Sequence, residues 1–232
     1  MSLSNLLKKI ADSEPGPETC ALFDFDGTII SGYSATAFLK DQIARGELSP
    51  ADLIQLTQAA TRFGIGSLGF SALMAVHAQY LAGRSESEYI ANSERLFRRA
   101  IAKLVYPEAR QLIDAHRAKG HSIAIISSAT PYQVIPAAKD LGIDNVYATD
   151  LEVVDGHFTG SVVTPTCFGQ GKVLAAEAFA EDHGGSVDRS FFYSDSTDDI
   201  ALLETVGYPV VLNGSKQLRV IAAEKRWPSA DF

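Results

Sequence analysis

The stretch Asp24-Phe25-Asp26-Gly27-Thr28 places two acids one residue apart at the end of a short apolar run. Side chains alternate along an extended strand, so Asp24 and Asp26 are expected to project to the same side. Two carboxylates held this close repel each other unless a cation lies between them or they share a proton. Gly27 permits a sharp turn after the strand. The pattern therefore predicts a cation site, and a solvated turn with two surface acids is the alternative.

A second polar cluster, Ser127 and Ser128, follows the apolar run Ser122–Ile126 and precedes Pro131, a residue suited to the first turn of a helix. A hydroxyl in this position, together with backbone N–H groups, can bind a phosphate oxygen. Capping the helix is the commoner task of such a hydroxyl. The cluster alone therefore leaves both interpretations open.

The remaining candidates are Lys172, at the head of a helical pattern, and the acids Asp195 and Asp199, which follow the apolar run Phe191–Tyr193. The two acids converge if Asp195 lies in a turn and Asp199 lies in the first turn of a helix. A single lysine is usually a solvated charge, and acids at a helix start are favoured by the helix dipole. Four such groups in one chain are difficult to attribute to accident, so we predict that they form one phosphate and metal site.

Apolar runs typical of buried strands alternate with helical patterns along the chain. This alternation predicts an α/β fold, with a Rossmann-like parallel sheet and helices on both faces. Ligands bind at the carboxyl ends of the strands in such sheets, where the candidate residues stand. The strand patterns are Ala21–Phe25, Ser122–Ile126, Phe191–Tyr193 and Pro209–Leu212, and the helical patterns are Pro107–Lys119, Pro131–Leu141, Lys172–Ala180 and Asp198–Thr205.

Two segments depart from this alternation. From about Ser34 to Leu104 the pattern is helical, with Pro50 as a first-turn residue and no strand signal. We expect this segment to form a helical cap, inserted after the first strand and lying over the site. The second segment, Asp150–Thr164, alternates around Asp155-Gly156, which predicts a small antiparallel hairpin.

The composition is that of a globular protein, with 46% hydrophobic and 21% charged residues and a formal net charge of −8. The absence of a basic run argues against nucleic acid or an anionic membrane as a partner. The two cysteines are too few for a disulfide framework, and the sequence shows no secretory signal and no membrane span. We therefore expect a cytoplasmic protein without stable membrane insertion. An acidic protein with an anionic substrate needs a metal or local positive charge.

Taken in order, the four polar stretches resemble the motifs of the haloacid dehalogenase superfamily, in particular its phosphoserine-phosphatase-like branch, subfamily IB. The motifs are Asp24–Thr28, Ser127, Lys172, and Asp195 with Asp199. The resemblance extends from about Ala21 to the C-terminus. It implies a core domain of residues 1–32 and 105–232 and a helical cap domain of the C1 type at residues 33–104.

The resemblance implies that Asp24 attacks phosphorus and becomes an aspartyl-phosphate. Asp26 then protonates the leaving group and later takes a proton from water. The implied cofactor is Mg²⁺, held by the Asp24 carboxylate, the Asp26 backbone carbonyl and Asp195.

Ser127 and Lys172 are implied to bind the transferring phosphoryl group. The spacing from Leu141-Gly142 favours Ser127 over Ser128, although both remain candidates. Gly27 and Tyr33 are placed at the bound phosphate or substrate. Two residues have supporting roles in this assignment: Thr28 fixes the loop, and Asp199 orients Lys172 or supports the metal shell.

The sequence departs from the branch pattern at four points. The last motif begins Ser194-Asp195 instead of Gly-Asp, and Asp198 stands where many relatives have Asn. Tyr33 replaces a Glu that binds a substrate amine, and the cap segment Phe70–Val76 lacks an Arg for a substrate carboxylate. An amino-acid substrate would then be poorly paired, at a cost of several kcal/mol, so we do not expect phosphoserine as substrate.

The predicted function is Mg²⁺-dependent hydrolysis of a small organic phosphomonoester, which is also the expected partner. One alternative is phosphoryl transfer to an acceptor other than water. Another is a phosphate-binding regulatory module without turnover, although such a module has no use for an acid/base at Asp26.

Overall fold

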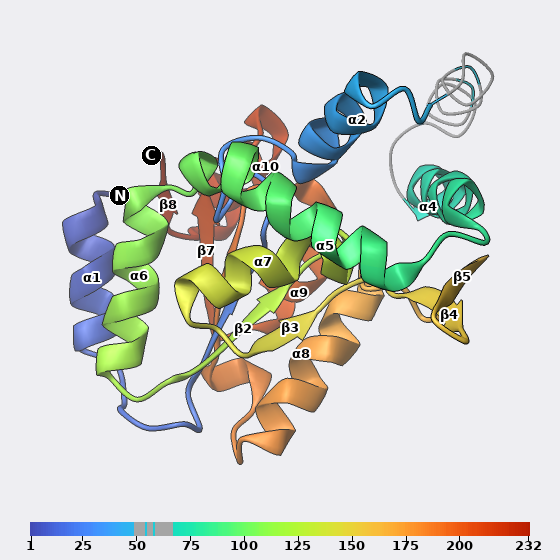
Figure 1. Ribbon diagram of the computed structural model, residues 1–232. Coiled ribbons are helices and arrows are strands. Elements are labelled where there is room, and N and C mark those ends of the chain that lie inside the picture. Colours follow the sequence, from blue (N-terminus) through green and yellow to red (C-terminus); the bar gives the residue numbers. More distant parts are fainter. Residues whose placement is uncertain (49–53, 55–57, 59–66) are drawn as a thin grey trace.

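The computed structural model describes residues 1–48, 54, 58 and 67–232, and its centre is a six-stranded sheet (Figure 1). The strand order is β3-β2-β1-β6-β7-β8, and every neighbouring pair runs parallel. The predicted parallel sheet is therefore confirmed. Its strands are β1 Cys20–Phe23, β2 Ser122–Ile126, β3 Asn145–Tyr147, β6 Phe191–Ser194, β7 Tyr208–Leu212 and β8 Ser229–Ala230.

Helices cover both faces of this sheet, as predicted, because alternate residues of each strand are apolar on opposite sides. On one face Phe23 and Ile125 pack in a cluster with α1, α6 and α7. On the other face Leu22 and Ala124 pack with α8, α9 and α10. The helices are α1 Leu3–Ala11, α6 Pro107–Ala118, α7 Pro131–Leu141, α8 Gln170–Asp182, α9 Ile200–Thr205 and α10 Lys216–Lys225, and a short 3-10 helix, η3, covers Val187–Arg189.

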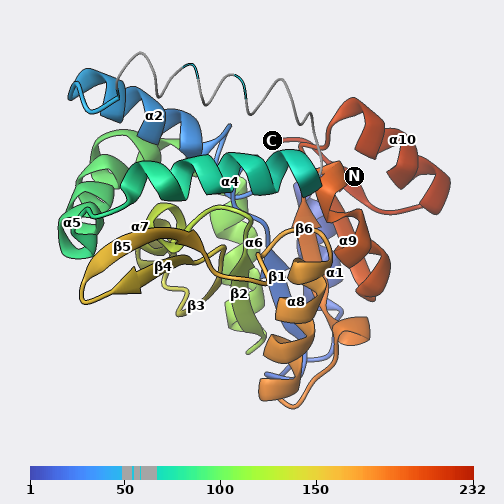
Figure 2. The same cartoon turned by 90° about the vertical axis from the view of Figure 1, so that its right-hand side faces the viewer.

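The regular secondary structure described between β1 and α6 is helical, in agreement with the sequence pattern. In Figure 2 α4 crosses above the sheet, and α2 lies higher still, at the left of the view. Pro50 lies outside the described residues, and the division into core and cap domains stays a prediction. The elements are α2 Ser34–Ala44, α4 Ser67–Leu81, α5 Glu86–Leu96, the π-helix η1 Phe97–Ile101 and the 3-10 helix η2 Ala102–Leu104.

A two-stranded antiparallel hairpin, β4 Leu151–Val154 and β5 His157–Val162, stands apart from the main sheet. Its turn residues Asp155 and Gly156 have φ of 51° and 73°, the left-handed values of a tight hairpin turn. The predicted hairpin is therefore confirmed. Strand β5 packs against α4, and the N–H of Gly83, just after α4, donates to the carbonyl of Phe158 at 2.8 Å.

The structure differs from the sequence patterns mainly at element ends. Strand β1 ends at Phe23, so Asp24 and Phe25 follow the strand instead of belonging to it. The strands β3 and β8 were not predicted, because three and two residues are too short to show a pattern. Within the described residues we find no helix with both the length and the apolar character needed to cross a bilayer.

The buried strands of the sheet should dominate stability. Leu22 is fully buried in β1, whereas Leu174 in α8 is 50% exposed. We expect Leu22→Ala to lower the free energy of unfolding by about 2–5 kcal/mol, because it removes apolar contacts and leaves a cavity. The matched change Leu174→Ala should cost about 0.5 kcal/mol or less. Urea denaturation measures both, and equal losses would contradict the assigned core.

Candidate active site

The strand register brings the predicted site residues to one edge of the sheet. Phe23 in β1 aligns with Ile125 in β2 and with Tyr193 in β6. The residues just beyond, which include Asp24 and Ser127, therefore emerge side by side at the carboxyl ends of the strands. Backbone hydrogen bonding continues past the end of β1, where the N–H of Asp24 donates to the carbonyl of Tyr193 at 2.9 Å.

Lys172, near the start of α8, forms the most buried ion-pair cluster of the site. Its ammonium lies 2.7 Å from Asp24 Oδ1 and 2.7 Å from Asp199 Oδ1. The lysine side chain is only 3% exposed, so its charge depends on these two carboxylates. Asp199 is the last residue of the 3-10 helix η4, Thr197–Asp199, and it also accepts a hydrogen bond from Ser194 Oγ at 2.7 Å. Of the two roles considered for Asp199, the geometry favours orienting Lys172.

The charges within this cluster shift one another's protonation. Burial alone would lower the pKa of Lys172, but the negative charges of Asp199 and Asp24 raise the pKa above its ordinary value. Burial raises the pKa of Asp24, Lys172 opposes the shift, and Asp199 and Asp195 add to it. Asp24 Oδ2 makes no hydrogen bond to any described residue. One oxygen of Asp24 is therefore anchored and the other is available to a ligand.

Asp26 is hydrogen-bonded to the start of α2. Its Oδ1 accepts from the N–H of Ser34 at 2.7 Å, and its Oδ2 accepts from Ser34 Oγ at 3.0 Å. Gln133 Nε2 in turn donates to Ser34 Oγ at 2.9 Å. Burial raises the pKa of Asp26 to about 6, against the opposing effect of the two Ser34 hydrogen bonds. The first residue of α2 thus holds Asp26 in place.

Gly27 makes room for Asp195. Its φ is 76°, and a Cβ built on it would lie 2.1 Å from Asp195 Oδ2. Burial, followed by the charge of Asp199, raises the pKa of Asp195 to about 7. The carbonyl of Gly27 accepts from Asn213 Nδ2 at 3.2 Å, which ties the loop to the end of β7. Glycine is therefore required here by both backbone conformation and space.

The acids of the site outnumber its cations. The charge of Asp195 raises the pKa of Asp24, and the charge of Asp26 raises the pKa of Asp195. Lys172 is the cation that lowers the pKa of all three acids. Such mutual repulsion suits a divalent cation with oxygen ligands. No three His, Cys, Asp or Glu side chains form a ready metal cluster within the described residues. The predicted ligand set of two carboxylates and one backbone carbonyl does not require such a cluster.

The serine candidates follow β2. Ser127 is buried, and its Oγ accepts from the N–H of Ala129 at 3.2 Å, whereas Ser128 is partly exposed. Thr130 is the residue that caps α7, and its N–H donates to Gln133 Oε1 at 2.9 Å. The helix-cap alternative for Ser127 is therefore wrong, because Thr130 has that role.

The remaining candidates lie around this group. Tyr33 caps α2 without a side-chain hydrogen bond and is 65% exposed. The charge of Asp195, with burial and the other acids, raises the pKa of the Tyr33 phenol above its ordinary value. The hydroxyl of Thr28 is buried and has no hydrogen-bond partner among the described residues, while its N–H donates to Phe25 at 3.3 Å. Within the described part of the chain, the hydroxyl of Thr28 therefore makes no bond that would fix the loop.

Sequence reasoning missed several residues that hold the site together. Ser34 gives no signal, because its contact with Asp26 depends on where α2 begins. Thr130 and Gln133 match the spacing of a capping box, a signal that could have been used. Asn213 directly follows an apolar run, as the other site residues do, and its φ of 51° fits the Asn-Gly pattern of a turn.

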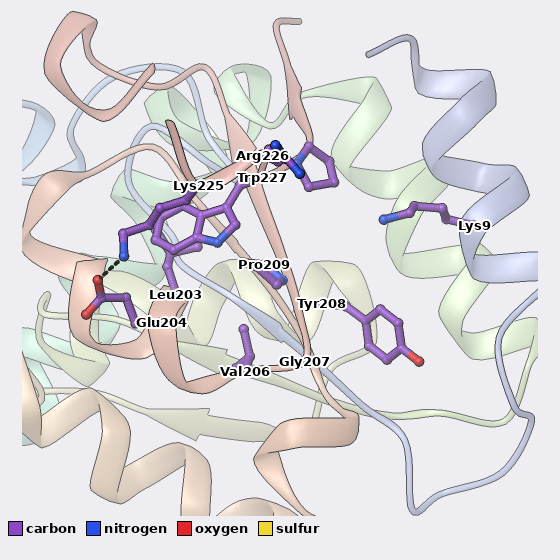
Figure 3. Close-up of a pocket in the computed structure, with 11 residues that line it drawn as sticks. Lys9, Leu203, Glu204, Val206, Gly207, Tyr208, Pro209, Lys225, Arg226 and Trp227 are labelled. Carbon is purple, nitrogen blue, oxygen red and sulfur yellow. Dashed lines mark ion pairs between the residues drawn. The ribbon is translucent and has the colours of Figure 1, made fainter. Parts of the chain in front are cut away.

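A separate groove, of about 560 Å³, lies between α9, β7 and α10 (Figure 3). Lys9, Tyr208, Arg226 and Trp227 line it. Its acid is Glu204, which pairs with Lys225 at 2.6 Å. None of the candidate residues lines this groove, so it is not the predicted site.

Comparisons with known proteins place this arrangement in context. Residues 21–204 match the family described as haloacid dehalogenase-like hydrolase. A phosphoserine phosphatase of Mycobacterium tuberculosis is 33% identical over 217 residues, 91% of this chain and 70% of that protein. A histidinol-phosphatase of Neisseria meningitidis is 29% identical over 91% of this chain and 98% of its own length. A solved structure of a Bordetella pertussis protein of unknown function has a TM-score of 0.83 at 27% identity, covering 93% of this chain and 99% of that one.

The close approach of Asp195 to Gly27 is testable by adding one methyl group. Gly32 has a similar φ of 79° with no atom within 4 Å of a Cβ, so Gly32→Ala measures the conformational cost alone, about 1–2 kcal/mol. Gly27→Ala should lower the free energy of unfolding by about a further 1 kcal/mol or more, because Asp195 must move. Urea denaturation compares the two variants, and equal costs would contradict the contact.

Proposed function

The chain belongs to the haloacid dehalogenase-like hydrolases, and we propose that it hydrolyses a small organic phosphomonoester through an aspartyl-phosphate on Asp24. The placement of Asp24 is the observation that supports this most. Lys172 binds one carboxylate oxygen and leaves the other unbonded among the described residues. A buried carboxylate held in this way is a suitable nucleophile for an electrophilic phosphorus.

In the first step the free oxygen of Asp24 forms a bond to phosphorus, and the bond from phosphorus to the leaving oxygen breaks. Asp26 gives its proton to that leaving oxygen. In the second step a water oxygen forms a bond to phosphorus, and the water passes a proton to Asp26. The bond between Asp24 and phosphorus breaks, so phosphate leaves and the Asp24 carboxylate is restored. Ser34 and Gln133 keep Asp26 in position through the hydrogen bonds described above.

Charge stabilisation in this proposal comes from Lys172 and from the phosphate-binding Ser127, with Ser128 as the neighbouring candidate. The Asp24 and Asp195 carboxylates and the Asp26 carbonyl would hold Mg²⁺. When bound, Mg²⁺ offsets the excess of acids and withdraws charge from the phosphoryl oxygens. Gly27 and Tyr33 would lie beside the bound substrate, at the loop and at the rim.

The substrate that we propose is a phosphomonoester other than phosphoserine. Relatives named as a phosphoserine phosphatase and a histidinol-phosphatase show that the family handles different phosphate esters. Here Tyr33 replaces an acid that would bind an amine. Phe70 of α4 stacks on Phe168, four residues before Lys172, with ring centroids 4.4 Å apart. These aromatic rings favour a substrate with an apolar or aromatic body.

We also propose the division into a core domain of residues 1–32 and 105–232 and a cap domain of residues 33–104. In support, the chain leaves and re-enters the core at adjacent points. The N–H of Ser31 donates to the carbonyl of Leu104 at 2.8 Å, and Ile30 bridges Val105. The cytoplasm is the proposed compartment, because Cys20 and Cys167 are buried free thiols.

The nucleophile assignment predicts the effect of an isosteric change. Asp24→Asn should lower kcat for p-nitrophenyl phosphate on the order of a thousandfold or more, because the amide does not attack phosphorus. The circular dichroism spectrum should stay native. The control Asp12→Asn, an exposed acid after α1, should keep full activity. Near-native turnover by Asp24→Asn would remove Asp24 from this role.

The metal assignment predicts reversible inactivation by chelation. Protein treated with EDTA and desalted should lose p-nitrophenyl phosphate hydrolysis, and added Mg²⁺ should restore it, because the uncompensated acids repel the phosphate dianion. The Asp195→Asn variant should require more Mg²⁺ for half-maximal activity. Full activity of the metal-free protein would contradict the proposal.

A further inference from the structure

Four arginines gather on the cap helices, outside the candidate active site. Arg45 follows α2, Arg95 lies in α5, and Arg98 and Arg99 lie in η1. Together with Asp41 they line one groove of about 430 Å³. This concentration of positive charge contrasts with the net charge of −8 for the whole chain.

The carboxylates near this groove neutralise only part of its charge. Asp41, which lines the groove, pairs with Arg45 at 2.9 Å and with Arg99. Arg45 also pairs with Glu47 at 2.7 Å. Arg95 bonds to the neutral amide of Asn92, and Arg98 makes no hydrogen bond or ion pair within the described part of the chain. Two guanidinium groups therefore face the groove without a neutralising partner.

The local helix geometry keeps these arginines together. Arg95, Arg98 and Arg99 are spaced i, i+3 and i+4, which places them on one side of the helical segment, where like charges repel. The π-helix η1 begins within this run, and such helices are frequent at functional sites. The Arg99 side chain is 68% exposed even though it pairs with Asp41. An anion bound in the groove would relieve this repulsion.

We propose that this groove binds a small anion that carries at least two phosphate groups. One guanidinium group can donate two parallel hydrogen bonds to the oxygens of a phosphate. Arg95 and Arg98 lack a neutralising partner within the described part of the chain, and the charges of Arg45 and Arg99 are partly neutralised, so the groove suits two phosphate groups. The groove has the size of a small-molecule site, not of a protein interface. A neighbouring groove of about 470 Å³ shares Asp41, Leu96 and Arg99 and reaches Tyr33, so a longer ligand has room to extend.

Inorganic pyrophosphate, titrated calorimetrically into the full chain in metal-free buffer, is the probe. We expect Arg98→Gln/Arg99→Gln to weaken binding about tenfold or more. The control Lys9→Gln/Arg226→Gln removes the same charge from the groove of Figure 3 and should change affinity by about twofold or less. Both variants should keep the circular dichroism spectrum of the native chain, which shows that they are folded, and their hydrolysis of p-nitrophenyl phosphate with Mg²⁺ should equal that of the native chain.

Three results would overturn the inference: no pyrophosphate binding by the native chain, unchanged binding by Arg98→Gln/Arg99→Gln, or equal weakening in the control. Tighter binding of a polyglutamate peptide than of pyrophosphate would also overturn it, in favour of an acidic protein partner. Because binding is measured without metal and turnover, failure here leaves the proposed phosphatase function untouched. If the native chain shows no phosphatase activity, the inference about the arginine groove likewise still stands or falls on the binding data.

Discussion

A buried ammonium group sets the main constraint on this molecule. Lys172 is almost inaccessible to water and depends on Asp24 and Asp199 for neutralisation. Removal of one partner from such a buried ion pair typically costs about 3–5 kcal/mol. The three residues come from the loop after β1, the start of α8 and η4, so the sheet must hold these segments in fixed register. The apolar packing on both faces of the sheet holds the strands, and so these three segments, in place.

The sequence was sufficient to predict the sheet and the placement of its polar residues, because strands buried on both faces read as continuous apolar runs. Ser122–Ile126 is predicted without error for this reason. The strands β3 and β8 were missed because they are short and lie at sheet edges. The hairpin turn at Asp155 and Gly156 was predictable because few residues adopt two successive positive φ values.

Contacts between side chains from distant segments were not predictable in the same way. The bond between Asp26 and Ser34 depends on the exact start of α2, and the pairing of Asp199 with Lys172 was one of two roles left open. Ser194, a departure from the family pattern, donates to Asp199, so it adds a hydrogen bond to the ion-pair cluster. Such contacts depend on the three-dimensional fold, because sequence spacing indicates only the edge of the sheet at which residues meet.

The central claim is that Asp24 carries the phosphoryl group during turnover. Acid quenching of the enzyme during steady-state hydrolysis, followed by proteolysis and mass spectrometry, tests this directly. We expect the peptide that contains Asp24 to gain the mass of one phosphoryl group, and the same peptide of Asp24→Asn to lack it. A phosphoryl group on the peptide that contains Ser127 and Ser128, with none on Asp24, would contradict it.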